Sequence, residues 1–372
     1  MRVGLDGRMQ TLKLTGIGRY SIQIYQWLSR LENRPELEVY PFGKSEIGGQ
    51  DSGRQSVLSE NRVFRGAFGL SRWAREKRID LYHATNYGSA PLVSMTIPWV
   101  LTVHDLLPLK DSGFYGRYFA MRAAFLLRHN IPRASHIIAI SSMAWQDTLE
   151  TFKLDPGKIT ITQLGIDEEL WWPWEVEKDK QIRAGYGLDW PYLLFVGVLN
   201  PRKNILGLIR AFHQVLRESK DENHRLVLAG SAGWKSREIF EHIQRNDLSG
   251  KVKILGFVPG ADLPAIFHGA TALVHPSFYE SFAYPILEAY CAGIPVIASS
   301  APNMPEVTGT CSLLINPHIT EEIAEAMAKM ISDPVLREKM IRQGRERSRL
   351  FNWKETALRT LAVYEKVLGG AN

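Results

Sequence analysis

The sequence predicts two doubly wound α/β domains joined by a linker. Short apolar runs alternate with stretches of helical periodicity up to about residue 165, and the same alternation begins again after about residue 190. Strands separated by helices form parallel sheets, because the connection between two parallel strands must cross one face of the sheet. A chain of 372 residues is also long enough for two cores of ordinary size.

The first series contains six expected strands and two clear amphipathic helices. The strands are expected at residues 2–5, 37–41, 81–83, 99–104, 136–140 and 158–162, and the helices at residues 22–31 and 120–130. Residues 167–189 carry charge, tryptophan and Pro173 without a clean period, so we interpret them as a linker.

The second series repeats the pattern. Strands are expected at residues 192–197, 225–229, 252–255, 272–275, 296–298 and 312–315, with helices at 205–217, 236–246, 263–269 and 285–292. A last helix is expected at residues 352–368. The predicted domains are therefore residues 1–168, together with the C-terminal helix at about 352–372, and residues 169–351.

Composition and charge narrow the class of protein. The net charge is +6, and residues 1–165 hold 21 Lys and Arg against 14 Asp and Glu, so the excess lies in the first half. An excess of positive charge in one half of the chain favours an anionic partner, such as nucleic acid, lipid headgroups or a phosphorylated substrate. It is also compatible with a basic surface that only contacts solvent. Two basic clusters contain apolar residues. They are Arg117, Arg122, Arg128 and Arg133 within residues 114–133, and Arg72, Arg75, Lys77 and Arg78 around Trp73.

The expected location is the cytoplasm, with peripheral contact at the inner face of an anionic plasma membrane. The two cysteines, Cys291 and Cys311, lack metal-ligand spacing, and the chain shows neither a secretory signal nor an apolar run long enough to span a bilayer. The basic segment at 114–133 can rest on such a membrane, or it can be an ordinary helix of a domain core.

The strongest local signal is the run HPSFYESFAYPILEAYCAGIPVIAS at residues 275–299. It leaves a strand, passes through a polar turn with Glu280, and enters a helix with Glu288 about one turn inside. The helix start offers backbone N–H groups at Phe282, Ala283 and Tyr284, and a helix N-terminus attracts anions. Two carboxylates on either side of an anion site suit a nucleotide sugar. As an isolated pair, the glutamates would be ordinary surface acids.

Positive charge is expected beside this site. Arg202 and Lys203 stand in VGVLNPRKN, residues 196–204, where a helix opens. Cations at a helix start oppose its dipole and therefore need an anion nearby. A departing nucleoside diphosphate gains negative charge that must be stabilised, in some transferases by a metal on an Asp-x-Asp pair. The chain has no Asp-x-Asp, so we expect Arg202 and Lys203 to replace the metal, and we expect no cofactor.

The N-terminal half carries a glycine turn and histidines at two expected strand ends. In TGIGRY, residues 15–20, the glycine spacing approaches G-x-G-x-x-G, but Ser21 holds the sixth position, which disfavours a nicotinamide dinucleotide. His83 ends one strand, and His104 with Asp105 ends another. Asp105 is expected either to receive a hydrogen bond from a hydroxyl group of an acceptor substrate or to hold His104 in one tautomer.

The residues 275–299 resemble glycosyltransferase family 4, which has the two-domain GT-B fold and the signature E-x7-E within PS-x-x-E-x-F-x-x-P-x-x-E-A-x-x-x-G-x-P-V. The matching residues are Pro276, Ser277, Glu280, Phe282, Pro285, Glu288, Ala289, Gly293, Pro295 and Val296. The resemblance extends from the N-terminal glycine turn to FNWKE at residues 351–355. Two positions depart from the pattern: Ala283 replaces a usual glycine, and Val198 a usual arginine.

The resemblance implies a fold and a set of site residues. Two Rossmann-like domains would face one another across a cleft, and the C-terminal helix would pack back on the N-terminal domain. Glu280 would bind hydroxyls of the transferred sugar, Glu288 the ribose, and His104 a sugar hydroxyl beside the acceptor. The other implied donor contacts are Gly16, Gly18, Gly230, Val258, Ser281, Phe282, Ala283 and Tyr284, and the implied acceptor contacts are His83 and Tyr20.

The resemblance further implies a retaining reaction by front-side displacement. It is greatest with bacterial mannosyltransferases of polysaccharide assembly, which implies transfer from GDP-mannose to a glycan or lipid-linked acceptor in cell-surface polysaccharide or lipopolysaccharide synthesis. UDP-glucose and UDP-galactose donors remain alternatives, as do a GT-B nucleotide-sugar epimerase and a pyridoxal-phosphate phosphorylase. A nucleic-acid-binding module would leave Glu280 and Glu288 unexplained, so no nucleic acid partner is expected.

Overall fold

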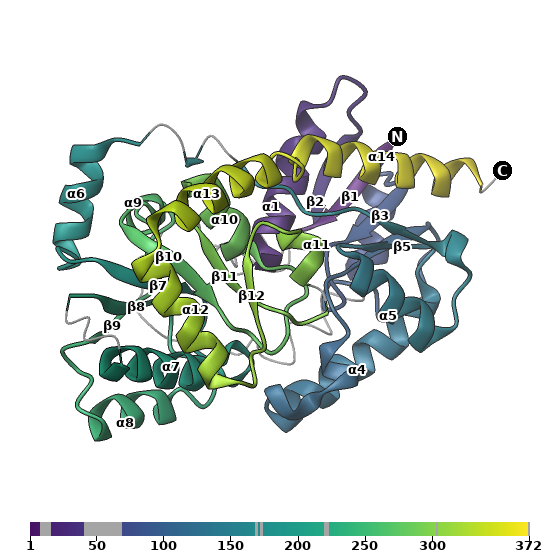
Figure 1. Ribbon diagram of the computed structural model, residues 1–372. Coiled ribbons are helices and arrows are strands. Elements are labelled where there is room, and N and C mark those ends of the chain that lie inside the picture. Colours follow the sequence, from purple (N-terminus) through teal and green to yellow (C-terminus); the bar gives the residue numbers. More distant parts are fainter. Residues whose placement is uncertain are drawn as a thin grey trace. The chain divides into compact units, whose positions relative to one another are not determined.

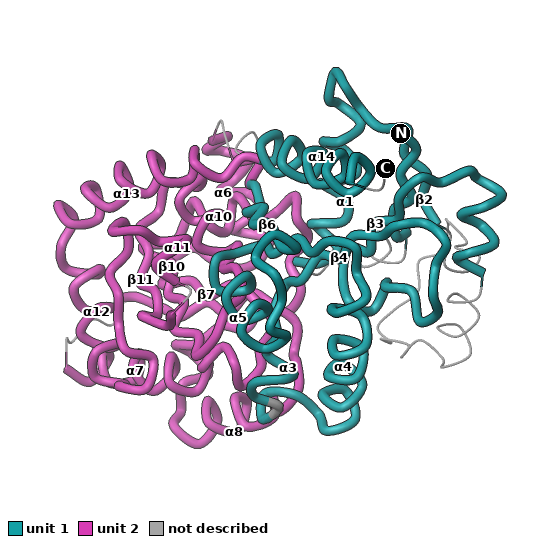
Figure 2. Tube along the Cα trace, turned by 90° about the vertical axis from the view of Figure 1, so that its right-hand side faces the viewer, with its two compact units in different colours: residues 1–165, 353–372 teal, residues 166–352 magenta. Residues whose placement is uncertain are grey.

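The computed structural model describes residues 1–7, 16–40, 69–167, 170–171, 174–218, 223–302 and 304–370. The chain divides into two compact units (Figure 2). Unit 1 is Met1–Gly165 with Trp353–Asn372, and unit 2 is Ile166–Asn352. The divisions fall within a few residues of the sequence-derived boundaries at 168/169 and 351/352. The two units are described separately below.

Unit 1 is built on a six-stranded parallel sheet in the order β2-β1-β3-β4-β5-β6. The strands are β1 (Arg2–Asp6), β2 (Glu36–Tyr40), β3 (Leu81–Ala84), β4 (Trp99–Val103), β5 (His136–Ala139) and β6 (Ile159–Ile161). The order of the strands reverses between β1 and β3. In open parallel sheets, ligands bind beyond the carboxyl ends of the strands at such a switch point.

The helices of unit 1 include one from the C-terminal end of the chain. They are α1 (Gly16–Arg30), α3 (Leu107–Lys110), α4 (Arg117–Asn130), α5 (Ser142–Phe152) and α14 (Trp353–Gly369). Helix α14 packs on α1, where the Trp353 and Tyr20 rings lie 6.3 Å apart. A Cβ atom on Gly165 would lie 2.2 Å from the Trp353 nitrogen, so only glycine permits this approach. The predicted return of the C-terminal helix to the N-terminal domain is confirmed.

Unit 2 holds a second six-stranded parallel sheet, in the order β12-β11-β10-β7-β8-β9. The strands are β7 (Tyr192–Val196), β8 (Arg225–Ala229), β9 (Val252–Gly256), β10 (Ala270–His275), β11 (Val296–Ser299) and β12 (Leu313–Ile315). Here the order reverses between β7 and β10, so the segments after these two strands flank the switch point.

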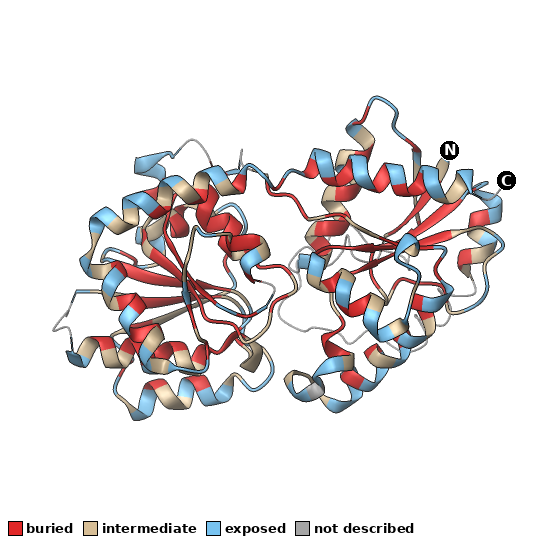
Figure 3. Ribbon diagram, turned by 45° about the vertical axis from the view of Figure 1, so that its right-hand side comes forward, coloured by how far each residue is buried: buried red, intermediate tan, exposed pale blue. Residues whose placement is uncertain are grey.

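Helices cover both faces of this second sheet. Helices α7 (Ile205–Glu218) and α8 (Arg237–Arg245) lie on one face, and α9 (Leu263–His268) and α10 (Tyr284–Ala292) on the other (Figure 1). Helix α12 (Thr320–Ser332) packs on α7, and α13 (Pro334–Ser348) packs on α10. Figure 3 shows the resulting pattern, in which the strands are buried and the outer helix surfaces are exposed. The expected two doubly wound α/β domains are confirmed.

The predicted linker at residues 167–189 is wrong in part. It contains α6 (Val176–Gly185), which packs on α9. The helix is highly charged, so its apolar period is weak, and polar contacts fix it instead. Asp179 binds His268 at 2.6 Å, and the Tyr186 hydroxyl donates to Asp262 at 2.7 Å. The sequence interpretation also omitted α5, α12 and α13.

Candidate active site

Glu280 is the centre of the candidate site in unit 2. The chain leaves β10 at His275 and reaches α10 at Tyr284, and Glu280 stands in the segment between them. Its side chain is directed inward, and the residue is only 4% exposed. A carboxylate that is buried to this degree requires compensating donors or charges.

The compensating groups come from the segment that follows β7. Arg202 Nη1 donates to Glu280 Oε2 at 3.0 Å and to the Tyr279 carbonyl at 2.9 Å. Lys203 Nζ donates to Glu280 Oε1. The short 3₁₀ turn Pro201–Lys203, followed by Asn204 in the left-handed conformation, presents both cations before α7 begins. Arg202, Lys203 and Glu280 were identified in two separate segments of the sequence, and in the structure they meet in one cluster.

His275 is a member of this cluster that the sequence interpretation missed. It is fully buried, its ring stacks on Phe195, and its Nε2 lies 3.0 Å from Glu280 Oε1. Burial lowers the pKa of His275, so the neutral ring donates from Nε2. The sequence did contain a signal for His275, because this histidine stands at the end of an expected strand, near the same position as His83 in its own strand. The buried Ser277 hydroxyl next to it has no hydrogen-bond partner among the described residues.

The electrostatics of the cluster favour an anion. Burial raises the pKa of Glu280, but the charges of Lys203 and Arg202 outweigh it, so the pKa lies well below its ordinary value and the carboxylate is ionised. Burial lowers the pKa of Lys203 to about 8, although Glu280 opposes the shift. At neutral pH, two cations thus share one carboxylate. The unbalanced charge suits a phosphate group.

The start of α10 differs in one respect from the prediction. The Tyr284 N–H donates to the Phe282 carbonyl at 3.1 Å, which closes a tight turn at Ala283 with φ −87° and ψ 76°. Tyr284 therefore does not offer the unpaired N–H group that the sequence predicted. Glu288 lies within α10 and is buried, and Ser281 is half-buried before the helix.

Three loops of unit 2 come together at the carboxyl edge of the sheet. The Gly197 N–H donates to the Ala229 carbonyl at 2.9 Å, and the Gly230 N–H donates to the Gly256 carbonyl at 2.8 Å. Gly230 has φ +158°, and a Cβ atom there would lie 1.9 Å from the Gly197 carbonyl oxygen. Val258 is buried in the third loop. Gly230 is thus required for the loops to approach one another, a role that the sequence did not specify.

In unit 1, His104 lies directly after β4 and is nearly buried. Its Nε2 donates to the Thr85 carbonyl at 2.8 Å, and burial lowers the pKa of His104 to about 4. The ring is therefore neutral, with Nδ1 as an acceptor. Of the two roles expected for Asp105, the fixing of this tautomer belongs instead to the Thr85 carbonyl. Asp105 Oδ1 accepts the Leu107 N–H at 3.1 Å, at the first residue of α3.

The acceptor contacts of His83 and Tyr20 stay a prediction, but both side chains are hydrogen-bonded within unit 1. Both residues are fully buried. His83 Nδ1 lies 2.7 Å from the Tyr364 hydroxyl, and Nε2 lies 2.7 Å from Thr102 Oγ1, which is also 2.9 Å from the Tyr20 hydroxyl. Burial lowers the pKa of His83 to about 3. With both ring nitrogens bonded, His83 joins the sheet to α1 and α14.

The predicted N-terminal glycine loop is partly helix. Helix α1 begins at Gly16, so both Gly16 and Gly18 lie in its first turn, and Gly18 is buried. Residues 8–15, which complete the predicted loop, lie outside the described residues. A contact of Gly16 or Gly18 with the donor phosphates therefore stays a prediction.

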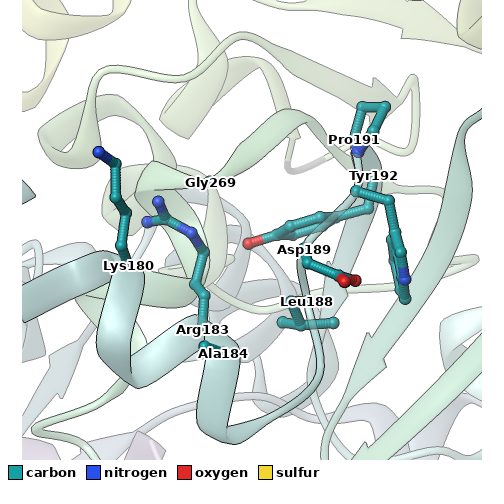
Figure 4. Close-up of a pocket in the computed structure, with 9 residues that line it drawn as sticks. Lys180, Arg183, Ala184, Leu188, Asp189, Pro191, Tyr192 and Gly269 are labelled. Atoms are coloured by element: carbon teal, nitrogen blue, oxygen red, sulfur yellow. The ribbon is translucent and has the colours of Figure 1, made fainter. Parts of the chain in front are cut away.

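A pocket of about 380 Å³ lies at the opposite edge of the unit 2 sheet, where β7 begins (Figure 4). Arg183 donates to the Ala265 carbonyl at 3.2 Å, and the Tyr192 hydroxyl donates to the Ile266 carbonyl at 2.6 Å. A Cβ atom on Gly269 would lie 2.4 Å from Arg183. These groups hold α6 and the sheet against α9, and the pocket is separate from the Glu280 cluster.

Two family models match the chain. The model described as Glycosyltransferase Family 4 matches residues 16–170, and the model described as Glycosyl transferases group 1 matches residues 178–347. The first lies almost wholly in unit 1 and the second wholly in unit 2. The second match contains Arg202, Lys203, Glu280 and Glu288.

Individual proteins agree with these models. O-antigen chain mannosyltransferase B of Escherichia coli is 26% identical over 371 residues, which are 95% of this chain and 96% of that protein. Alpha-maltose-1-phosphate synthase of Mycolicibacterium smegmatis is 30% identical over 291 residues, 73% of each chain. The solved structure of HepE from Anabaena with UDP-glucose superposes with a TM-score of 0.75, at 18% identity, over 98% of this chain and 100% of that chain. The chain therefore belongs to glycosyltransferase family 4 and is a glycosyltransferase with the GT-B fold.

Proposed function

We propose that the protein is a retaining, metal-independent hexosyltransferase that transfers mannose from GDP-mannose to a glycan or lipid-linked acceptor. The observation that carries this proposal is the Arg202–Glu280–Lys203 cluster at the switch point of unit 2. It combines an unbalanced positive charge for a diphosphate with a fixed carboxylate for sugar hydroxyls.

Glu280 retains capacity for a sugar hydroxyl. A carboxylate has about four acceptor positions, two on each oxygen. Lys203 and His275 occupy Oε1, and Arg202 occupies one position on Oε2. The remaining position on Oε2 accepts a hydroxyl of the transferred sugar. Arg202, Lys203 and His275 hold the carboxylate in place, as preorganised catalysis requires.

The proposed reaction breaks the bond between the anomeric carbon and the donor phosphate oxygen. The acceptor hydroxyl forms the new bond on the same face of the sugar, and its proton passes to the departing phosphate. Arg202 and Lys203 stabilise the negative charge that develops on that phosphate. Glu288 binds the ribose, and His104 accepts a hydroxyl hydrogen bond at Nδ1.

The donor and acceptor assignments come from similarity. The Escherichia coli relative is named as an O-antigen chain mannosyltransferase. HepE was solved with UDP-glucose, which makes UDP-glucosyl or UDP-galactosyl transfer the second candidate. A lipid-linked acceptor places the enzyme at the inner face of the plasma membrane, in the synthesis of cell-surface polysaccharide.

A donor screen tests this proposal. The purified protein is incubated with GDP-mannose, UDP-glucose or UDP-galactose and with mannose-terminated acceptor analogues, in the presence and absence of a chelator. Thermal shift measures donor binding, and the anomeric configuration of the product is read by NMR. We expect GDP-mannose alone to stabilise the protein and to give an α-linked product without metal.

Three outcomes would contradict parts of the proposal. Stabilisation by a UDP-sugar only would replace the donor. Loss of activity with chelator and its recovery with Mn²⁺ would remove the role of the two cations as metal substitutes. Conversion of the nucleotide sugar itself, without transfer to any acceptor, would identify an epimerase.

A further inference from the structure

Helix α4 of unit 1 has two apolar faces, and only one of them is buried. The inner face packs into the core of unit 1 with Ala120, Ala123, Leu126, Leu127 and Asn130. On the opposite face, Tyr118, Met121 and Phe125 follow one another at spacings of three and four residues and therefore form a continuous ridge. They are 64%, 71% and 62% exposed, respectively. Large apolar side chains gathered on one helix face mark a binding surface.

The ridge is flanked by positive charge. At about 100° per residue, Arg117 and Arg128 lie along one edge of the ridge, and Arg122 lies along the other edge. All three arginines are exposed, and none has an ion-pair partner among the residues that the structure describes. No acidic residue stands between Asp111 and Asp147 in the sequence. A partner that matches this face would therefore combine an apolar region with negative charge.

The second basic cluster of the sequence has a different character. The Trp73 ring packs within 5.0 Å of the Tyr40 ring, and a Cβ atom on Gly4 would lie 2.8 Å from it. Arg72 pairs with Glu76 at 2.7 Å, and Lys77 pairs with Glu38 at 3.5 Å. Its aromatic residue is thus part of the fold of unit 1, and two of its charges are balanced.

The geometry points to α4 as the element that binds an anionic lipid bilayer. The ridge of Tyr118, Met121 and Phe125 enters the boundary between headgroups and acyl chains, and the arginines on its edges contact lipid phosphates. None of the described helices has the length and apolar character needed to cross a bilayer. The inference deepens the proposed action on a lipid-linked acceptor, but vesicle binding needs no catalysis, so the two proposals can fail separately.

Flotation with vesicles tests this assignment on the full chain. The vesicles contain phosphatidylcholine alone or an equal mixture with phosphatidylglycerol. A charge variant carries R117E, R122E and R128E, and an apolar variant carries M121S and F125S. A control carries R72E and R75E in the second basic cluster, around Trp73. Hydrogen exchange of residues 117–130 is followed with and without vesicles, and the melting temperature of each variant is recorded.

We expect binding to the mixed vesicles only, with slowed exchange in residues 117–130. Each basic residue near an anionic surface contributes a factor of about five, so the charge variant should bind on the order of a hundredfold more weakly. The apolar variant should lose on the order of tenfold or more. The control should bind as the wild type does, and all variants should keep the wild-type melting temperature and transfer to a short soluble acceptor.

Several results would overturn the inference. Equal binding to both vesicles, or binding to neither, would remove the anionic bilayer as the partner. Undiminished binding of the apolar variant would exclude insertion of the ridge. Concentration-dependent self-association that the apolar variant abolishes in the absence of vesicles would assign the ridge to a second copy of the chain. A large fall in melting temperature of the charge variant would show that the arginines serve the fold.

Discussion

Lys203 and Glu280 form a buried ion pair across the switch point of unit 2, although 77 residues separate them in the sequence. Lys203 follows β7, Glu280 follows β10, and the two strands are neighbours in the sheet. The pair therefore depends on the pairing of β10 with β7. The topology of the sheet, rather than a local motif, brings the cations to the carboxylate.

Replacing Glu280 by Gln preserves its shape and removes its charge. The buried cations then lose their common partner, and the sugar loses its strongest acceptor. We expect transfer to fall on the order of a hundredfold or more, the size typical of one preorganised polar group. Steady-state rates at saturating donor check this. The exposed carboxylate of Glu325 on α12 provides the control variant Glu325→Gln. Near-normal turnover of Glu280→Gln would place the site elsewhere.

The pH profile of donor affinity should report Lys203. Its pKa is lowered by burial from the ordinary 10.5 to about 8, so the cation is lost as the pH rises through 8. Affinity should then fall about tenfold per pH unit, whereas Lys203→Arg should give a flat profile. Between about pH 8 and 10.5 the unfolded chain binds this proton more tightly, so the free energy of unfolding should rise with pH in that window. A flat wild-type affinity profile would contradict the assignment.

His275 acts as a positioning residue for Glu280. His275→Leu removes the donor to Oε1 and should lower kcat about tenfold to a hundredfold with little change in the KM for the donor, because the carboxylate loses its orientation. His275→Gln can place an N–H group near the position of Nε2 and should recover part of the rate. Equal rates in the two variants, at equal melting temperature, would contradict this role.

Gly230 should tolerate no side chain. Gly230→Ala would place a methyl group 1.9 Å from the Gly197 carbonyl oxygen at φ +158°, so we expect a loss of more than about 2 kcal/mol in the free energy of unfolding, or failure to fold. Gly260→Ala is the matched control, because no atom lies within 4 Å of the added Cβ. Urea denaturation measures both. Similar stabilities would show that the loops can separate without cost.

Tyr364→Phe tests the structural assignment of His83. The variant leaves His83 Nδ1 without its partner in a buried site, which should cost about 1–3 kcal/mol of stability. Transfer rates measured well below the melting temperature should stay within about twofold of the wild type, since no substrate contact is lost. A large fall in kcat without a change in stability would place His83 in the acceptor site.

The fold and the cluster of Arg202, Lys203 and Glu280 were predictable from the same feature, which is the position of the strands in the sequence. The alternation of apolar runs identified all twelve described strands, and the strand ends located Arg202, Lys203 and Glu280. His275 was not identified as a member of the cluster, and Gly230 was expected as a donor contact but not as the point where two loops approach, because both roles depend on atoms from distant strands. The hydrogen bonds of His83 to Tyr364 and Thr102 could not be predicted for the same reason. A histidine at a strand end looks identical in sequence whether α14 covers it or not.

Because α14 belongs to unit 1, the order in which the two units are completed during synthesis can differ from their order in the sequence. Unit 1 begins at Met1, but it needs Trp353 against Gly165 and the Tyr364 hydroxyl on His83. The ribosome adds about 5–20 residues per second, so the roughly 190 residues between Gly165 and Trp353 take on the order of 10–40 s to synthesise. Unit 2 can finish first, although it is encoded later. Unit 1 thus starts to emerge before unit 2 and can be completed only after it, because its sheet lacks α14 until residues 353–369 have been synthesised.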